Sequence, residues 1–272
     1  MNAGVKCIGI VACKMFEDEL VEVLSHDKSM TNIYVIKNEE LDGFLNKMRE
    51  KVSRVNLRAI STSDIESLDL DPSSAVVWLK PMALHHKPEK LREDVIETLS
   101  VMKKKCNVVL LFYGLCGNAL KRIDELKMKT GCEIEIIRDG KGEIVDDCIG
   151  AVIGGSDEYL KCLRENKGSF FLTPMWASNW REMLHKVQIM STPDDIEGAR
   201  IVFQSVGYNK VIKLDTGLGN ENEFEKNVRD FANTFGFQRD ELKGDLSIIF
   251  ESYVRARSLV VSENQRNPVI IE

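Results

Sequence analysis

The sequence lacks the features of several large classes of protein. No stretch is long and apolar enough to span a membrane, and the N-terminal stretch lacks the basic start, apolar core and cleavage site of a signal peptide. A net charge of −6 argues against a nucleic acid or an anionic membrane as a partner. We therefore expect a cytoplasmic protein with no membrane and no nucleic acid among its partners.

The seven cysteines do not follow a disulfide or zinc-ribbon pattern. Their number is odd, their spacing is irregular, and no Cys-x-x-Cys motif occurs. We interpret them as free thiols, metal ligands or both. Four of them lie in strands, beside strands or in a helix and receive no functional role; they are Cys7, Cys106, Cys132 and Cys162.

Phosphate-binding motifs are missing as well. The segment Asp215-Thr-Gly-Leu-Gly219 follows a predicted strand, but it has neither the full glycine spacing of a dinucleotide site nor the Lys-Ser/Thr of a P-loop. Asp215 and Gly217 therefore have two interpretations of equal weight. They line a ligand site, or they belong to an Asx turn.

The segment around Cys116 carries the clearest sign of a ligand site. An apolar run from Val108 to Phe112 predicts a strand buried on both faces, and a glycine-rich turn follows directly. Glycines on both sides of a cysteine let the backbone approach a ligand closely. The turn residues that we expect next to a ligand are Tyr113, Gly114, Gly117 and Asn118.

Predicted strands alternate with predicted helices along most of the chain. This alternation predicts an α/β fold with a mostly parallel sheet and helices on both faces. We treat residues 1–272 as one domain, with two lobes of similar size as the alternative and a boundary near residue 166. The last strand is expected at residues 258–262.

Three cysteines and a histidine fall at comparable places in this pattern. Cys13 and Cys116 follow predicted strands, and Cys148 begins a predicted helix. His85 and His86 lie in the loop after another strand. Because the carboxyl ends of parallel strands meet at one edge of a sheet, these side chains can converge. Thiolates with an imidazole suit zinc, iron or an iron–sulfur cluster.

Two other interpretations of these residues stay open. Cys116 could act as a reactive thiol of lowered pKa with His85 as its base, and a first helical turn favours the thiolate of Cys148. All three cysteines could instead be buried and inert. Trp176, which follows a proline at a strand end, either walls the same pocket or belongs to the core.

Motifs spread along the chain carry a family resemblance. The most specific is Tyr113-Gly-Leu-Cys-Gly-Asn118. The shorter ones are Ala12-Cys13, Leu84-His85 with Pro88-Glu-Lys-Leu91, Asp147-Cys-Ile149, Gly155-Ser156 with Tyr159, Phe171-Leu-Thr-Pro174 with Trp176, and Leu214-Asp-Thr-Gly-Leu-Gly219. Together these motifs resemble the family known as domain of unknown function 1638.

The resemblance implies that the three cysteines belong to a shared pattern, with one histidine that corresponds to His85. The chain departs from the family at two positions. Asp146 stands where the family often has histidine, and Met175 stands where it usually has glycine. The first departure removes one candidate ligand or proton carrier.

Members of this family tend to accompany corrinoid-dependent methyl-transfer systems of one-carbon metabolism, so the resemblance implies a corrinoid protein or a methyltransferase as partner. The leading hypothesis is a protein that binds zinc, iron or an iron–sulfur cluster and supports corrinoid-dependent methyl transfer or its redox activation. Its ligands would be Cys13, Cys116 and Cys148, with His85 as the fourth ligand or a neighbour. The alternatives are a non-catalytic module for a cofactor or small molecule, and a metal-free thiol enzyme. Nothing in the sequence sets the oligomeric state.

Overall fold

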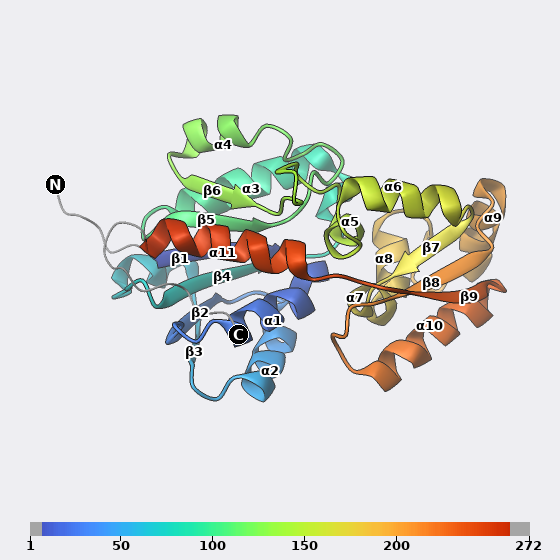
Figure 1. Ribbon diagram of the computed structural model, residues 1–272, viewed down its shortest axis with the longest axis horizontal. Coiled ribbons are helices and arrows are strands. Elements are labelled where there is room, and N and C mark those ends of the chain that lie inside the picture. Colours follow the sequence, from blue (N-terminus) through green and yellow to red (C-terminus); the bar gives the residue numbers. More distant parts are fainter. Residues whose placement is uncertain (1–6, 262–272) are drawn as a thin grey trace.

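Two parallel sheets organise the structure, a computed structural model that describes residues 7–261. The strands are β1 (Cys7–Cys13), β2 (Asn32–Ile36), β3 (Asn56–Ile60), β4 (Ser74–Lys80), β5 (Cys106–Phe112), β6 (Glu133–Ile136), β7 (Ser169–Leu172), β8 (Lys210–Asp215) and β9 (Gln238–Lys243). The first sheet has the order β3-β2-β4-β1-β5-β6 and the second has the order β7-β8-β9 (Figure 1). All strand pairs in both sheets are parallel, which confirms the predicted α/β class.

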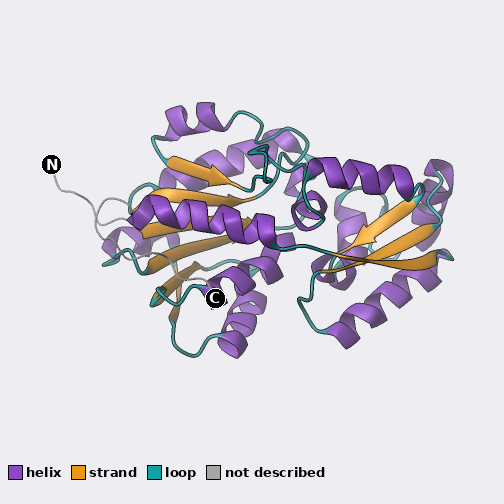
Figure 2. Ribbon diagram, in the orientation of Figure 1, coloured by secondary structure: helices purple, strands orange, loops and turns teal. Residues whose placement is uncertain are grey.

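Helices cover both faces of the first sheet, as the apolar central strands require (Figure 2). All seven residues of β1 are buried. The helices are α1 (Glu17–His26), α2 (Leu41–Lys51), α3 (Pro88–Met102), α4 (Ile123–Thr130), α5 (Cys148–Val152), α6 (Ser156–Glu165), α7 (Pro174–Ser178), α8 (Trp180–Lys186), α9 (Ile196–Val206), α10 (Glu221–Phe235) and α11 (Ser247–Val261). Of these, α1, α2 and α11 lie on one face of the first sheet, and α3 and α4 lie on the other.

The chain forms two lobes of unequal size. The first lobe contains strands β1 to β6 with the helices around them, and the second contains β7 to β9 with α7 to α10 (Figure 1). Helix α6 leads into the second lobe, and after β9 the chain returns so that α11 packs on β5, β6 and β1. The second sheet has three strands against six in the first, and the C-terminal helix packs on the first lobe.

The expected strand at residues 258–262 is wrong over its described part. Residues 258–261 are the last turn of α11, and residue 262 lies outside the described range. Tertiary contacts explain the helix, because Tyr253 and Arg257, one turn apart, both donate hydrogen bonds to Oδ2 of Asp27 at 2.7 and 2.9 Å. In a strand these two residues would lie about 13 Å apart, too far to share one carboxylate oxygen.

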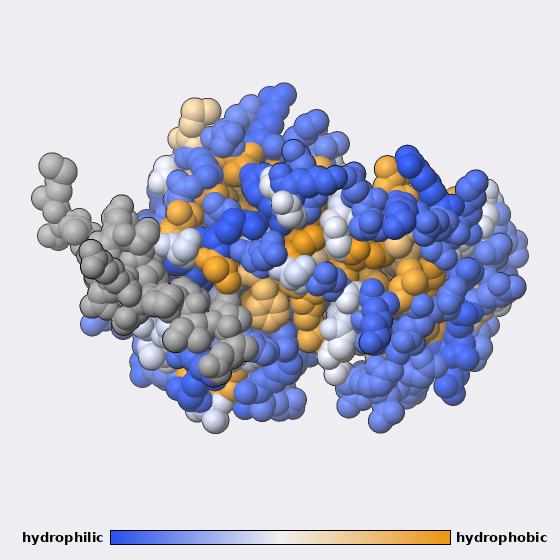
Figure 3. Space-filling model, in the orientation of Figure 1, coloured by the Kyte–Doolittle hydropathy of each residue, from blue (hydrophilic) through white to orange (hydrophobic). Residues whose placement is uncertain are grey.

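The strand order brings four carboxyl ends together at the edge that faces the second lobe. Strands β4, β1, β5 and β6 are consecutive neighbours in the sheet. Their following loops therefore meet beside β7 and α7, and hydrophobic side chains show along the boundary between the lobes in Figure 3. None of the helices in the described range has the length and apolarity needed to cross a membrane.

Candidate metal and ligand site

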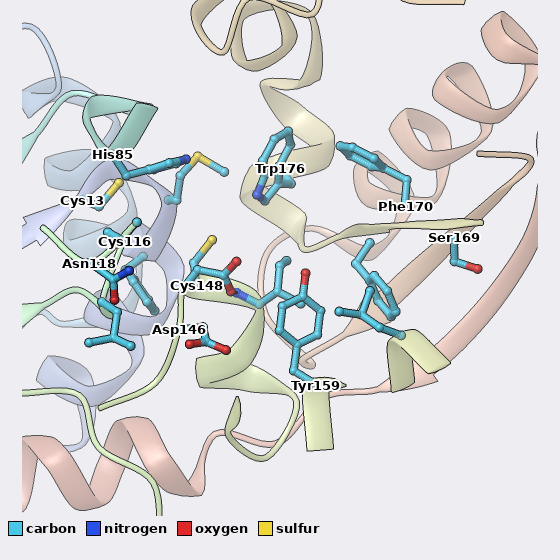
Figure 4. Close-up of a pocket in the computed structure, with 18 of the residues that line it drawn as sticks. Cys13, His85, Cys116, Asn118, Asp146, Cys148, Tyr159, Ser169, Phe170 and Trp176 are labelled. Carbon is cyan, nitrogen blue, oxygen red and sulfur yellow. The ribbon is translucent and has the colours of Figure 1, made fainter. Parts of the chain in front are cut away.

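A cavity of about 400 Å³ lies between the carboxyl edge of the first sheet and the second lobe (Figure 4). This volume is within the usual range of small-molecule sites. The polar and thiol side chains that line it from the first lobe are Cys13, His85, Cys116, Asn118, Asp146, Asp147 and Cys148. The predicted thiols and the predicted histidine therefore reach one cavity.

Each of these donors comes from a neighbouring strand. Cys13 is the last residue of β1, and Cys116 lies in the loop after β5. His85 belongs to the three-ten helix Leu84–His86 that follows β4. Cys148 follows β6 through a longer loop and is the first residue of α5, whose preceding residue Asp147 accepts hydrogen bonds from two backbone N–H groups of that helix. The parallel topology alone thus accounts for the convergence.

Gly114 allows the loops of Cys116 and Cys148 to pack directly on each other. Backbone hydrogen bonds run from the N–H of Leu115 to the carbonyl of Val145 at 2.8 Å and from the N–H of Cys116 to the carbonyl of Asp146 at 2.9 Å. A Cβ atom at Gly114 would lie 2.4 Å from the Val145 carbonyl oxygen. The structure therefore places Gly114 in loop packing, outside the cavity lining where we expected it.

The backbone around Cys116 is held in a rarely populated conformation. Cys116 and Asn118 have φ angles of 47° and 67°, and Gly117 between them has 67°. Left-handed backbone is uncommon for residues other than glycine and costs roughly 1–3 kcal/mol for each of them. Ala83, before the His85 turn, has the same feature with a φ of 64°. Such strain often marks a functional site.

Burial gives the three thiols high pKa values. It raises the pKa of Cys13 to about 11 and the pKa of Cys116 to about 12. The pKa of Cys148 rises well above its usual range, first through burial and then through the nearby carboxyl group of Asp147 and the thiols of Cys13 and Cys116. All three thiols are protonated at neutral pH. The interpretation that gave Cys116 a lowered pKa and favoured the thiolate of Cys148 is therefore wrong, because burial raises the pKa of both thiols and at Cys148 outweighs the short helix α5.

His85 presents a neutral imidazole to the cavity. Burial lowers its pKa below the usual value, and the neighbouring His86 adds to the effect. Among the described residues the His85 ring makes no hydrogen bond, so no contact supports its role as a base for Cys116. Neutral imidazole is the form that binds metals.

Aromatic side chains form the opposite wall of the cavity. Tyr159 comes from α6, Phe170 and Phe171 come from β7, Trp176 comes from α7, and Tyr208 precedes β8. Figure 4 shows Tyr159 and Trp176 on either side of the space next to Cys148. Sequence reasoning assigned a pocket role only to Trp176, which does line the cavity. Tyr159 and Phe171 belong to the family motifs but received no role there, and Phe170 and Tyr208 lie outside those motifs.

The sequence of the chain matches a known protein family over most of its length. The family described as "Protein of unknown function (DUF1638)" matches residues 79–253. The chain belongs to the DUF1638 family. The matched segment includes His85, Cys116, Cys148 and Trp176, whereas Cys13 precedes it. No curated protein matches the chain.

The donor atoms that this DUF1638 protein offers, sulfur and imidazole nitrogen, are of the chemical type that thiophilic metals prefer. Soft sulfur donors with an imidazole select zinc, copper or iron over magnesium and calcium. The thiols lie close enough for Cys13 to raise the pKa of both Cys116 and Cys148. Within residues 7–261, however, no three His, Cys, Asp or Glu side chains are arranged to hold an ion. Binding would therefore require the thiols to turn toward one another.

Tyr113 and Glu19 support the thiol side of the cavity from within the protein. The Tyr113 hydroxyl is buried without a hydrogen-bond partner among the described residues, and Tyr113 is not one of the residues that line the cavity. Burial, and then the adjacent Asp18, raises the pKa of Glu19 to about 8. Glu19 also influences the pKa of Cys148, so its carboxyl group lies near the site. Sequence reasoning missed Glu19 because a charged residue at a helix start usually faces solvent.

Asp215 and Gly217 lie outside the thiol cavity. The N–H of Gly217 donates to Oδ1 of Asp215 at 2.9 Å, which is the geometry of an Asx turn. The adjoining Leu218 and Gly219 line a second cavity of about 640 Å³, which Lys14 and Lys47 also line. The position of Asp215 and Gly217 therefore does not support the interpretation that they line the thiol site.

Proposed function

We propose that this DUF1638 protein binds one thiophilic metal centre, either zinc or iron, with the iron mononuclear or in an iron–sulfur cluster. Cys13, Cys116 and Cys148 would be its ligands, and His85 would be the fourth ligand or a close neighbour. The observation that carries the proposal is the convergence of three thiols and one unpaired imidazole in a single cavity.

The high thiol pKa values favour a metal centre over a metal-free thiol enzyme. Reactive cysteines have lowered pKa values because a cation or a helix N-terminus stabilises the thiolate. Here burial raises the pKa of Cys13 and Cys116, and no lysine or arginine occurs among the described residues that line the cavity. A divalent cation would supply the missing positive charge and would release the thiol protons on binding.

We propose a corrinoid protein or its methyltransferase, in the cytoplasm, as the partner of the loaded protein. The family resemblance motivates this choice. A zinc–thiolate centre would activate a thiol for methylation, and an iron–sulfur centre would supply electrons to a low-potential cobalt centre. The chain's own contribution is to hold the three sulfur donors at the sheet edge beside an aromatic wall.

A second candidate is a non-catalytic module that binds a cofactor or small molecule. The size of the cavity, about 400 Å³, favours it because a single ion needs far less space. Both candidates are compatible with one another when the small molecule binds next to the metal. They differ in whether purified protein turns a substrate over.

The metal proposal is tested by the metal content of protein purified without oxygen. Wild-type protein, Cys116→Ser and Cys162→Ser are compared by elemental analysis and ultraviolet–visible spectra. Cys162 lies on α6 and does not line the cavity, so its substitution is the matched control. We expect about one centre per chain in wild type and in Cys162→Ser, and a loss of at least tenfold in Cys116→Ser. Full loading of Cys116→Ser, or no metal in wild type, would reject the assignment.

A further inference from the structure

The charge of the cavity disfavours an anionic ligand. Asp146 and Asp147 contribute carboxyl groups to its lining, and the described lining residues include no lysine and no arginine. Carboxylate and phosphate ligands are usually bound by arginine, lysine or a helix N-terminus. The described lining residues include no arginine or lysine, and the N-terminus of the short helix α5, which does reach the cavity, is already capped by the Asp147 carboxyl group.

The rings of the aromatic wall pack on one another and make no cation–π contact with basic side chains of the described chain. Phe170 packs edge to face on Trp176 at 5.4 Å and on Tyr208 at 5.7 Å, while Tyr159 packs edge to face on Phe171 at 5.8 Å. Basic side chains in the described part of the chain stack on other rings, in the pairs Lys80 with Trp78, Arg181 with Trp180, and Lys213 with Phe224. No basic side chain of the described chain therefore occupies the face of a ring that lines the cavity.

One buried polar group in this wall has no partner. The hydroxyl of Ser169 is buried, lines the cavity and makes no hydrogen bond within the described residues. Buried hydroxyl groups are normally paired, and an unpaired one costs free energy. A ligand that carries a hydroxyl group next to its apolar part would satisfy Ser169.

We infer that the aromatic wall binds a small organic cation of the quaternary-ammonium type beside the thiols. Aromatic faces attract such cations, and carboxyl groups nearby add to the attraction. The inference deepens the proposed function on which it rests, because the cation would share the cavity with the proposed metal ligands, where Asp146 and Asp147 supply the carboxyl groups. Trp176 and Tyr159 are the rings that flank the space next to Cys148.

The test compares choline with its neutral carbon isostere, dimethylbutanol, by titration calorimetry on the full chain. The two molecules have nearly the same shape and the same hydroxyl group, so they differ mainly in charge. Choline should bind about tenfold more tightly than the isostere. Trp176→Leu should remove that preference and leave the affinity for the isostere nearly unchanged. Trp78→Leu, a substitution outside the cavity, should keep the preference.

Tyr159→Leu repeats the test on a half-buried residue if Trp176→Leu does not fold. Equal binding of choline and the isostere, or tighter binding of propionate than of choline, would overturn the inference. Metal content is measured on the same samples. A loaded protein without a choline preference rejects this inference alone, whereas a choline preference in a metal-free protein supports it and rejects the proposed metal centre.

Discussion

The two edges of the first sheet each carry three cysteines, and the two sets behave differently. Cys7, Cys106 and Cys132 lie where β1, β5 and β6 begin. The Sγ atoms of Cys7 and Cys106 are 3.4 Å apart, and the Cys132 thiol donates to the carbonyl of Leu99 at 3.6 Å. These thiols are buried, they contact protein atoms, and they do not line the cavity. The packing roles expected from the sequence agree with their positions.

The cysteines at the carboxyl edge face a cavity; Cys13 and Cys116 are buried, and Cys148 is partly exposed. They come with left-handed backbone at Cys116 and with the unpaired imidazole of His85. The residue type is therefore the same at both edges, whereas the position along the strands differs. The end of a parallel strand at which a cysteine lies decides whether its thiol packs against protein atoms or faces the cavity.

Helix α1 repeats this contrast with carboxyl groups. Near its start, Glu19 is buried with one oxygen unpaired, and burial raises its pKa. After its end, at the amino edge, burial alone would raise the pKa of Asp27. Arg257, Ser29 and Tyr253 outweigh burial there, and the pKa of Asp27 is lowered. The amino edge is thus fully paired, and the carboxyl edge keeps an uncompensated acid.

The largest effect is expected at the paired amino edge. Asp27→Ala leaves the guanidinium of Arg257 buried without its carboxylate, and loss of one partner of a buried pair costs about 3–5 kcal/mol. Urea unfolding measures this loss. Glu66→Ala, which breaks an exposed pair with Lys104, should cost less than about 1 kcal/mol. Equal losses in the two variants would contradict an anchoring role for Asp27. The folded fraction of Asp27→Ala should still load metal.

A smaller effect is expected at the loops of the carboxyl edge. Gly114→Ala forces a methyl group against the Val145 carbonyl, so we expect a loss of about 1–3 kcal/mol in the free energy of unfolding. It should also weaken metal binding, because the same contact aligns Cys116 with Cys148. The control is Gly140→Ala, where a Cβ meets nothing within 4 Å. If metal binding stays intact in Gly114→Ala, the loop contact does not position the ligands.

The smallest effect concerns the pH dependence of stability at Glu19. Its pKa rises from 4.5 to about 8 in the folded protein, so the fold favours the protonated form. The stabilising contribution is complete below pH 4.5 and is lost as the pH rises through about 8. Glu19→Gln stays neutral at every pH. The melting temperature of this variant minus that of wild type should therefore increase between pH 5 and pH 9, by about 2–4 °C for each kcal/mol that wild type loses. If thermal scans show the same difference in melting temperature between the variant and wild type at every pH, the claim that Glu19 is a buried, unpaired acid is contradicted.

Strands with apolar sequences were predictable, and a polar strand was not. The runs that form β1, β4 and β5 are buried on both faces, so their composition marks them. Strand β9 has the sequence Gln-Arg-Asp-Glu-Leu-Lys and is mostly exposed at the edge of the second sheet, where backbone pairing with β8 holds it. No side-chain pattern could reveal it.

The thiol side of the site was predictable from order along the chain, and the aromatic side was not. Strand-end positions located Cys13, Cys116 and Cys148 because parallel topology fixes where such ends meet. Tyr159 lies on α6, which leads into the second lobe, and Tyr208 lies within that lobe, so their approach to the thiols depends on how the lobes pack. The thiol pKa values also escaped prediction, since burial depends on that same packing.

X-ray absorption spectroscopy at the metal edge of anaerobically purified wild-type protein is the decisive measurement for the proposed metal centre. For a zinc centre held by the three cysteines and His85 we expect a first shell of about three sulfur atoms at roughly 2.3 Å with one nitrogen at roughly 2.0–2.1 Å. For an iron–sulfur cluster it predicts sulfur ligation throughout or with one nitrogen. Cys116→Ser should lose that sulfur shell. A shell of oxygen and nitrogen alone, or the same sulfur shell in Cys116→Ser, would contradict a metal centre at the carboxyl edge of the sheet.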